Sequence, residues 1–381
     1  MKRAALALAA TVLAACADSL KPDGTAGTTS APEFARPGGG GSGVTVIDLG
    51  TFSGANPSQS QAFGVNDNGY IVGSSSTASG VAHAFLWTPT APNATTGSMV
   101  DLGTLGGAYS AALGINVNRQ VAGASWIPSG VNRAVLWTPR GETVDLGTFP
   151  GGTESHAYAI NAVGQIVGWS SINGSRMHHA FLWTPSGQGA TTGAMVDLGT
   201  LVQGGVSEAA AVNDNGQVVG WGTSGGGEHA FLWTPTAPNA TTGAMTDLGT
   251  LGGSTSRARG INGLGQVVGE SYTASGTLHA FYWTAAGGMV DLGTLGGSAS
   301  QAFAINDRGQ IAGLSRVPMS GRPGGNGTEK VETVLWAPNG AGGWTIRDLG
   351  QNANTQVGMN NATTLEVVGK SGAHATLWVV Q

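Results

Sequence analysis

Short apolar runs separated by turn residues recur along the chain from residue 44 to its end. The first complete set covers residues 61–65, 70–74, 82–87 and 99–102, and each run has the length of one strand. Asn, Asp, Gly and Pro stand between the runs, which is typical of tight turns. The pattern therefore predicts successive groups of four short strands and an all-β protein.

Four sequence markers recur in every group, and each of them occurs seven times. An Asp-Leu-Gly triplet begins at Asp48, Asp101, Asp145, Asp197, Asp247, Asp291 and Asp348. An Asn after an apolar residue stands at Asn66, Asn116, Asn161, Asn213, Asn262, Asn306 and Asn360. A Gly ends the second strand and a Trp the third, the Trp at Trp87, Trp137, Trp183, Trp233, Trp283, Trp336 and Trp378. Steps of 42 to 53 residues between these Trp fit one four-stranded propeller blade each.

A His-Ala-Phe triplet precedes four of these Trp, at His83, His179, His229 and His279. With it the chain resembles the bacterial extracellular repeats named HAF after this triplet. The resemblance spans residues 44–381, although the second, sixth and seventh units depart from the triplet. It implies a repeat fold and an extracellular location, and it implies no reaction.

Loop lengths predict how the strands are grouped into blades. The Trp strand and the next Asp-Leu-Gly strand are joined briefly, as across 138–142, whereas the Gly-rich segment 293–300 suits a crossing to the next blade. The last blade then lacks its outermost strand, which residues 44–49 can supply. We therefore expect a seven-bladed β-propeller whose ring is closed by the N-terminal strand, a topology that resembles WD-repeat propellers. In an alternative grouping each blade begins at Asp-Leu-Gly, without this overlap.

The repeated polar residues are predicted to be structural. Five His stand four residues before a repeat Trp, at His83, His179, His229, His279 and His374. They belong to different blades, too far apart to share a metal ion, so we expect hydrogen bonds in place of a metal site. The Asp of Asp-Leu-Gly precedes a turn and is predicted to cap its strand end.

Positions where the repeats differ are the candidate ligand site. Five residues before each Asn stand Gln61, Ala111, His156, Glu208, Arg257, Gln301 and Thr355. These residues open the innermost strands, so their side chains should gather at one mouth of the ring axis. Glu208 and Arg257, on neighbouring units, could instead form an ion pair. The loops after the second strands add Trp126, Trp169, Trp221 and Tyr272. These rings suit stacking on a sugar or a protein, or else packing between blades.

Composition narrows the function classes. The chain has 381 residues, of which 66 are Gly and 40% are hydrophobic, and a net charge of −5. This hydrophobic content excludes a disordered chain, and the lack of a basic patch argues against nucleic acid as a partner. A single Cys excludes a disulfide framework. We expect no cofactor, and the sequence does not indicate an oligomeric state.

The N-terminus predicts export. Residues 1–15 combine a basic start with an apolar run, and the segment ending at Cys16 resembles the bacterial lipoprotein signal, in which this Cys is lipidated. Ordinary secretion is the alternative. Residues 16–43 are rich in Gly, Ser and Pro, which predicts a flexible tether between a lipid anchor on Cys16 and the propeller at 44–381. The expected location is the outer membrane or cell surface.

Three functions fit these features. The leading hypothesis is a non-catalytic binding or scaffold propeller that engages a glycan or a protein through its top face. The second is a secreted lyase or hydrolase with His156, Glu208 and Arg257 at the mouth, because these groups suit acid–base chemistry and anion stabilisation. The third is a purely structural surface module.

Overall fold

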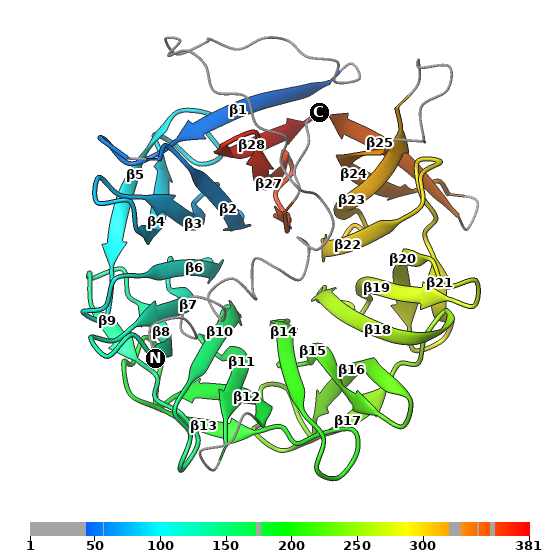
Figure 1. Ribbon diagram of the computed structural model, residues 1–381, viewed down its shortest axis with the longest axis horizontal. Coiled ribbons are helices and arrows are strands. Elements are labelled where there is room, and N and C mark those ends of the chain that lie inside the picture. The colour runs from blue at the N-terminus through cyan, green and yellow to red at the C-terminus, as the bar shows by residue number, and fades with distance from the viewer. Residues whose placement is uncertain (1–42, 56, 173–176, 320–328, 341–342, 351–354) are drawn as a thin grey trace.

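The computed structural model describes residues 43–55, 57–172, 177–319, 329–340, 343–350 and 355–381. Their strands form seven four-stranded antiparallel sheets arranged around a central axis (Figure 1). The predicted all-β seven-bladed propeller is therefore confirmed. The signal segment 1–15, Cys16 and all of the tether except Gly43 lie outside the described residues. Within the described ranges, no helix has the length and hydropathy needed to cross a membrane.

Blades 1 to 6 each use four consecutive strands, numbered from the axis outward, and blade 7 uses the last three strands together with the first. The innermost strands are β2 (Ser60–Val65), β6 (Ser110–Ile115), β10 (Ser155–Ile160), β14 (Ser207–Val212), β18 (Gly252–Ile261), β22 (Ser300–Ile305) and β26 (Gly358–Met359). The second strands are β3 (Ile71–Ser76), β7 (Val121–Trp126), β11 (Ile166–Ser171), β15 (Val218–Ser224), β19 (Val267–Thr273), β23 (Ile311–Pro318) and β27 (Leu365–Ser371).

The outer half of each blade carries the Trp strand and the Asp-Leu-Gly strand. The third strands are β4 (Ala82–Pro89), β8 (Asn132–Trp137), β12 (His178–Pro185), β16 (Gly227–Pro235), β20 (Leu278–Thr284), β24 (Glu329–Pro338) and β28 (His374–Val380). The outermost strands are β5 (Gly97–Gly103), β9 (Thr143–Asp145), β13 (Gly193–Asp197), β17 (Gly243–Asp247), β21 (Gly288–Asp291), β25 (Trp344–Gly350) and β1 (Val44–Gly50).

The ring is closed inside blade 7. Strand β1 pairs antiparallel with β28, from Val44 opposite Val380 to Asp48 opposite Thr376. The sheet order β1-β28-β27-β26 confirms that the N-terminal strand supplies the outermost strand of the last blade, and the grouping that begins each blade at Asp-Leu-Gly is wrong. Because the two ends of the chain share one sheet, the ring leaves no open edge at its seam.

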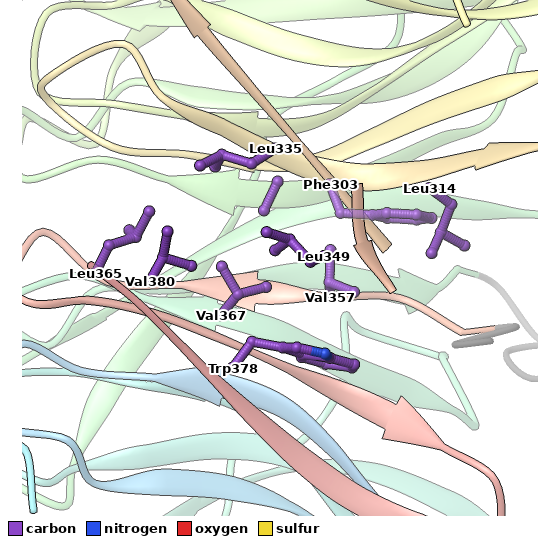
Figure 2. Packing of buried hydrophobic residues seen from close by; sticks show 10 residues of the cluster. Phe303, Leu314, Leu335, Leu349, Val357, Leu365, Val367, Trp378 and Val380 are labelled. Carbon is purple, nitrogen blue, oxygen red and sulfur yellow. The ribbon is translucent and has the colours of Figure 1, made fainter. Parts of the chain in front are cut away.

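Apolar side chains fill the spaces between neighbouring blades. Between blades 6 and 7, for example, Phe303, Leu314 and Leu335 face Val367 and Trp378 (Figure 2). The repeat Phe and Trp lie in equivalent clusters, with Phe181 and Trp183 between blades 2 and 3. Each blade therefore shares its core with the next, and the repeated aromatic residues are explained by packing.

Two sets of hydrogen bonds tie neighbouring blades and define the two faces of the ring, and among the described residues the upper set occurs at six junctions and the lower set at five. At the upper face, where the innermost strands begin, the N–H of Ala84 donates to Ser110 Oγ (2.8 Å) in the next blade. Equivalent bonds use Ser155, Ser207, Ser256, Ser300 and Ser60. At the lower face, Asn66 Nδ2 donates to the carbonyl oxygen of Asn116 (2.9 Å). With both ends held, the starts of neighbouring inner strands keep a fixed spacing.

Six of the innermost strands contain a register shift at the same place. In β10, Ala157 lies opposite Gly168 and Ala159 opposite Val167, so Tyr158 is an extra residue without a ladder partner. The equivalent extra residues are Phe63, Leu113, Ala210, Arg259 and Phe303. A bulge releases one side chain from the pairing pattern, so this position is free to vary from blade to blade.

Candidate functional site

Strand register brings the variable residues of blades 3, 4 and 5 to the upper face. His156 lies opposite Trp169 on the neighbouring strand, and Glu208 lies opposite Trp221 in the same way. Arg257 lies opposite Glu270 in blade 5. The hydrogen bonds described above hold these three blades side by side, so the opposed pairs form one continuous surface. We call it the mouth cluster, and its members are His156, Tyr158, Trp169, His178, Glu208, Trp221, Glu228, Arg257, Arg259 and Glu270.

Aromatic contacts join blade 3 to blade 4 within the mouth cluster. The His156 ring lies 4.7 Å from the Tyr158 ring and is stacked on Trp169 at 6.3 Å, measured between centroids. His178 contacts Trp169 at 5.1 Å and reaches Trp221 in the next blade at 6.2 Å. Both Trp are partly buried, so they are neither fully packed away nor isolated on the surface.

Glu208 is held by two side chains of the preceding blade. His178 Nε2 lies 3.0 Å from Glu208 Oε1, and the Tyr158 hydroxyl donates to Glu208 Oε2 at 3.5 Å. Trp169 Nε1–H donates in turn to the Tyr158 hydroxyl at 3.2 Å. A polar chain therefore runs from Trp169 through Tyr158 to Glu208, and it orients the carboxylate at the junction of the two blades.

Two Arg–Glu pairs border the cluster on the side of blade 5. Arg257 Nε donates to Glu228 Oε2 at 2.9 Å, and its guanidinium lies 4.8 Å from the centroid of the Trp221 ring. Arg257 therefore pairs with Glu228, on the Trp strand of blade 4, and not with Glu208, the alternative that the sequence offered. Arg259 binds Glu270 through Nε at 3.0 Å and Nη2 at 2.6 Å.

His156 is the most unusual ionisable group of the cluster. Its side chain is buried, and its Nδ1 has no hydrogen-bond partner among the described residues. Burial lowers the pKa of the imidazole to about 4, so the ring is neutral at pH 7. Burial also raises the pKa of the Tyr158 hydroxyl, an effect that the Glu208 charge reinforces. The cluster thus presents aromatic faces, a neutral imidazole and fixed carboxylates.

The other predicted ligand residues lie outside these contacts. Gln61 is buried at the equivalent position of blade 1, and Gln301 is partly buried in blade 6. Trp126 lies two residues further along its strand than Trp169 and packs on Tyr109 at 5.7 Å. Tyr272 shares the position of Trp126 and is 40% exposed. Because residues two apart share a strand face, Trp126 and Tyr272 lie on the same strand face as Trp169 but nearer the strand end, and they make none of the cluster contacts described above.

Five members of the cluster were not among the predicted ligand residues, namely Tyr158, Arg259, His178, Glu228 and Glu270, the ladder partner of Arg257. Tyr158 and Arg259 are bulge residues, two positions beyond the columns that were compared, and the comparison of repeats would have shown them as variable. His178 and Glu228 each directly precede a repeat His. Their role depends on contacts across a blade junction, which strand alternation within one repeat does not predict.

The repeated His and Asp pair with one another at the outer part of the upper face. His83 Nδ1 lies 2.9 Å from Asp101 Oδ2, and Asp101 Oδ1 accepts the N–H of Gly103 at 2.7 Å. The same His–Asp pairing occurs at His179, His229, His279 and His374. The predicted hydrogen bonds of the His and the strand-end caps of the Asp are confirmed. In the described part of the chain, no three His, Cys, Asp or Glu are placed to hold a metal ion.

Comparison with known proteins supports the fold. No family model and no curated protein matches the chain. A solved streptogramin B lyase is similar in structure at 14% identity, with a TM-score of 0.51, covering 89% of this chain and 98% of the lyase. The acylaminoacyl peptidase of Pyrococcus horikoshii aligns at 9% identity and a TM-score of 0.48, over 84% of this chain and 51% of the peptidase. A gluconolactonase of Xanthomonas campestris aligns at 9% identity and a TM-score of 0.38, over 71% of this chain and 86% of that enzyme. At these identities, the likeness to the lyase establishes a shared β-propeller fold.

Proposed function

We propose that this protein is an exported binding propeller that takes a carbohydrate at the mouth cluster of blades 3 to 5. The observation that carries the proposal is the pair of partly buried Trp169 and Trp221, linked through His178 and flanked by fixed carboxylates. Aromatic faces stack on the apolar face of a sugar ring, and carboxylates accept hydrogen bonds from its hydroxyls.

The charges of the cluster favour a neutral sugar over a strongly charged ligand. Arg257 and Arg259 are each already paired with a Glu, so neither guanidinium is left for an anionic group. The side chains of Glu208 and Arg257 are 19% and 32% exposed, which keeps polar atoms within reach of a ligand. Pre-ordered side chains also reduce the entropy that binding must overcome.

The proposal includes the cellular location of the protein. The basic and apolar N-terminal segment, the following Cys16 and the HAF-like repeats all support an exported chain held at the outer membrane or cell surface by a lipid. Mass spectrometry of the mature protein tests this part. A diacylglyceryl group on Cys16 is expected, whereas an unmodified N-terminus beyond residue 16 would replace the lipoprotein by a secreted protein.

Binding of soluble cell-wall and plant oligosaccharides to the full chain tests the ligand. Trp169→Ala and Trp221→Ala should each weaken binding by roughly 10-fold or more, because central aromatic residues dominate binding energies. Tyr70→Ala is the matched control, since it removes an aromatic side chain of blade 1 that stands in the Asn66 turn at the lower face, away from the cluster. Near-ultraviolet circular dichroism checks that the variants stay folded.

The outcome against the proposal is equally specific. If the wild type binds no oligosaccharide, or if all three variants bind like the wild type, the mouth cluster is no carbohydrate site. A purely structural surface module would then be the better account of the chain.

A hydrolase or lyase acting at the same cluster is the second candidate. It is favoured by the buried neutral His156 beside Glu208, whose carboxylate Tyr158 and His178 orient. Such groups suit proton transfer. Release of new chain ends from a bound glycan, lost in His156→Phe and Glu208→Gln, would support an enzyme. Unchanged glycan after long incubation would leave binding as the function.

A further inference from the structure

At the lower face, the junction between blades 7 and 1 repeats the hydrogen bonds of the junction between blades 3 and 4. In blade 3, Asn161 Nδ2 donates to Gln165 Oε1 at 2.9 Å, and the N–H of Gln165 donates to Asn161 Oδ1 at 2.8 Å. In blade 7, Asn360 Nδ2 donates to Glu366 Oε2 at 2.9 Å, and the N–H of Glu366 donates to Asn360 Oδ1 at 3.0 Å. Glu366 therefore occupies the place of Gln165.

The next blade contributes the same loop to both junctions. Asn239 of blade 4 and Asn93 of blade 1 both have positive φ, at 60° and 57°. Their N–H groups donate to equivalent turn carbonyls, those of Asn215 at 3.0 Å and Asn68 at 3.1 Å. The two junctions thus place an Asn from the following blade against the same pair of side chains.

The adjoining turns match as well. The N–H of Ala162 donates to Asp214 Oδ1 at 2.8 Å between blades 3 and 4. The N–H of Asn361 donates to Asp67 Oδ1 at 2.7 Å between blades 7 and 1. Equivalent positions across the two junctions can therefore be compared atom by atom.

The two junctions differ in their side-chain hydrogen bonds to the following blade, where Asn161 Nδ2 also donates to the carbonyl oxygen of Asn213 at 3.1 Å. Gln165 Nε2 donates to the carbonyl oxygen of Asn239 at 3.0 Å, and Asn161 Nδ2 reaches Asn239 Oδ1 at 3.3 Å. Among the described residues, Glu366 Oε1 and Asn93 Oδ1 are buried without a hydrogen-bond partner. An ionised carboxylate has no N–H or O–H to donate, and burying one beside other acceptors is costly.

We propose that Glu366 is protonated in the closed ring and that its Oε1 hydroxyl donates to the carbonyl oxygen of Asn93, so that loss of this proton weakens the junction that closes the ring. The carboxylic acid then does what the Gln165 amide does in the other junction. Burial raises the pKa of Glu366 to about 7, which is consistent with a proton held near neutral pH.

The surrounding charges do not replace this proton. Asp67 and Tyr70 belong to the facing turn of blade 1, where the Asp67 carboxylate accepts the N–H of Asn361. Arg308 of blade 6 binds the carbonyl oxygens of Asn361 (3.0 Å) and Ala362 (2.8 Å) on the exposed edge. Lys370 lies four residues further along β27, toward the upper face. The raised pKa is caused by burial alone.

The direction of the pH effect follows from the raised pKa. Because the folded state holds this proton more tightly, its stabilising effect is complete below about pH 4.5 and is lost as the pH rises to about 7. His156 has a lowered pKa and acts with the opposite sign over an overlapping range. The measurement must therefore compare variants at each pH.

The reciprocal pair Glu366→Gln and Gln165→Glu tests the proposal by urea unfolding of the full chain at pH 5 and pH 8. From pH 5 to pH 8, the unfolding equilibrium constant of the wild type should rise roughly 50-fold relative to that of Glu366→Gln. In Gln165→Glu, the unfolding equilibrium constant should depend on pH through a second carboxyl group, with the same sign. Parallel pH profiles of wild type and Glu366→Gln would overturn the proposal.

A spectroscopic readout keeps the test independent of stability. The infrared band of a protonated carboxyl group should be present in the wild type at pH 6 and reduced in Glu366→Gln. A band unchanged by the substitution would overturn the proposal. The proposal would also be overturned if Ca²⁺ stabilised the wild type at pH 8 but did not stabilise Glu366→Gln. A cation would then bridge the two unpartnered oxygens, Glu366 Oε1 and Asn93 Oδ1.

Discussion

Blades 3 to 5 and blades 6 and 7 have the same four-stranded plan, yet they differ at the upper end of the axis. The bulge residues are Tyr158 and Arg259 in blades 3 and 5, and Phe303 in blade 6. Phe303 and Leu314 are buried against blade 7 (Figure 2). By contrast, Trp169, at the strand position of Leu314, is partly buried and donates a hydrogen bond to Tyr158. One half of the mouth is apolar core and the other is a polar, aromatic surface.

This difference shows at which positions of a repeat fold a binding site can form. The strand ladder and the Asn turn recur in all seven blades and the Ser tie recurs in six, because these contacts hold the ring together. The first residues of the innermost strand and the bulge residue are not needed for these contacts. At these positions the side chains can change from apolar core residues to polar and aromatic residues that suit a ligand.

The largest effect is expected from Phe303→Ala in the apolar half. Removing this buried ring should lower the free energy of unfolding by about 4 kcal/mol, through lost burial and a cavity between blades 6 and 7. Urea unfolding measures it, and oligosaccharide affinity should stay unchanged. A loss below about 1 kcal/mol, or a loss of binding, would contradict the division of the mouth into two halves.

Arg259→Met should come next, in the polar half. It leaves the Glu270 side chain, which is 6% exposed, as an unpaired buried charge. The expected loss is about 3 kcal/mol, because removing one partner of a buried pair is costlier than removing both. The double variant Arg259→Met/Glu270→Met should recover much of this loss in the same unfolding measurement. An equally unstable double variant would show that the pair itself stabilises the blade.

The buried His156 predicts a pH dependence of intermediate size. Its folded pKa of about 4 lies below the usual histidine value of 6.5, so its contribution to stability is complete above pH 6.5 and is lost as the pH falls toward 4. Between pH 7 and pH 5, the wild type should lose about 2 kcal/mol relative to His156→Phe. Urea midpoints at the two pH values provide the measurement. Equal changes in both proteins would show that the His156 imidazole is solvated and not buried.

The smallest effect is expected at the His–Asp pairs, which occur in both halves of the ring. In His279→Ala the loss should stay below about 1 kcal/mol, because Asp291 is 40% exposed and keeps its bond to Gly293. His374→Ala in blade 7 should behave alike in thermal unfolding. A large difference between the two variants would mean that the halves also differ at their outer part.

Much of the fold could be predicted because each marker repeats with one physical role. The Trp spacing predicted seven blades, and the loop lengths predicted that residues 44–49 complete the last one, as β1 does. The site was predicted in part. His156, Glu208, Arg257, Trp169 and Trp221 do come together, but Trp126 and Tyr272 lie two residues further along their strands and outside these contacts.

By itself the sequence determined the ring, its seam and the blades that carry unusual side chains, because these follow from periodicity and loop length along one chain. Only the tertiary structure decided which groups meet across a blade junction. Glu228 takes Arg257 and His178 takes Glu208 because neighbouring blades are held a fixed distance apart. Glu366 stands after the repeat Asn where other repeats have Gln, so it lacks the amide donor of Gln. This difference matters only in the tertiary structure, where Asn93 of the next blade lies against it.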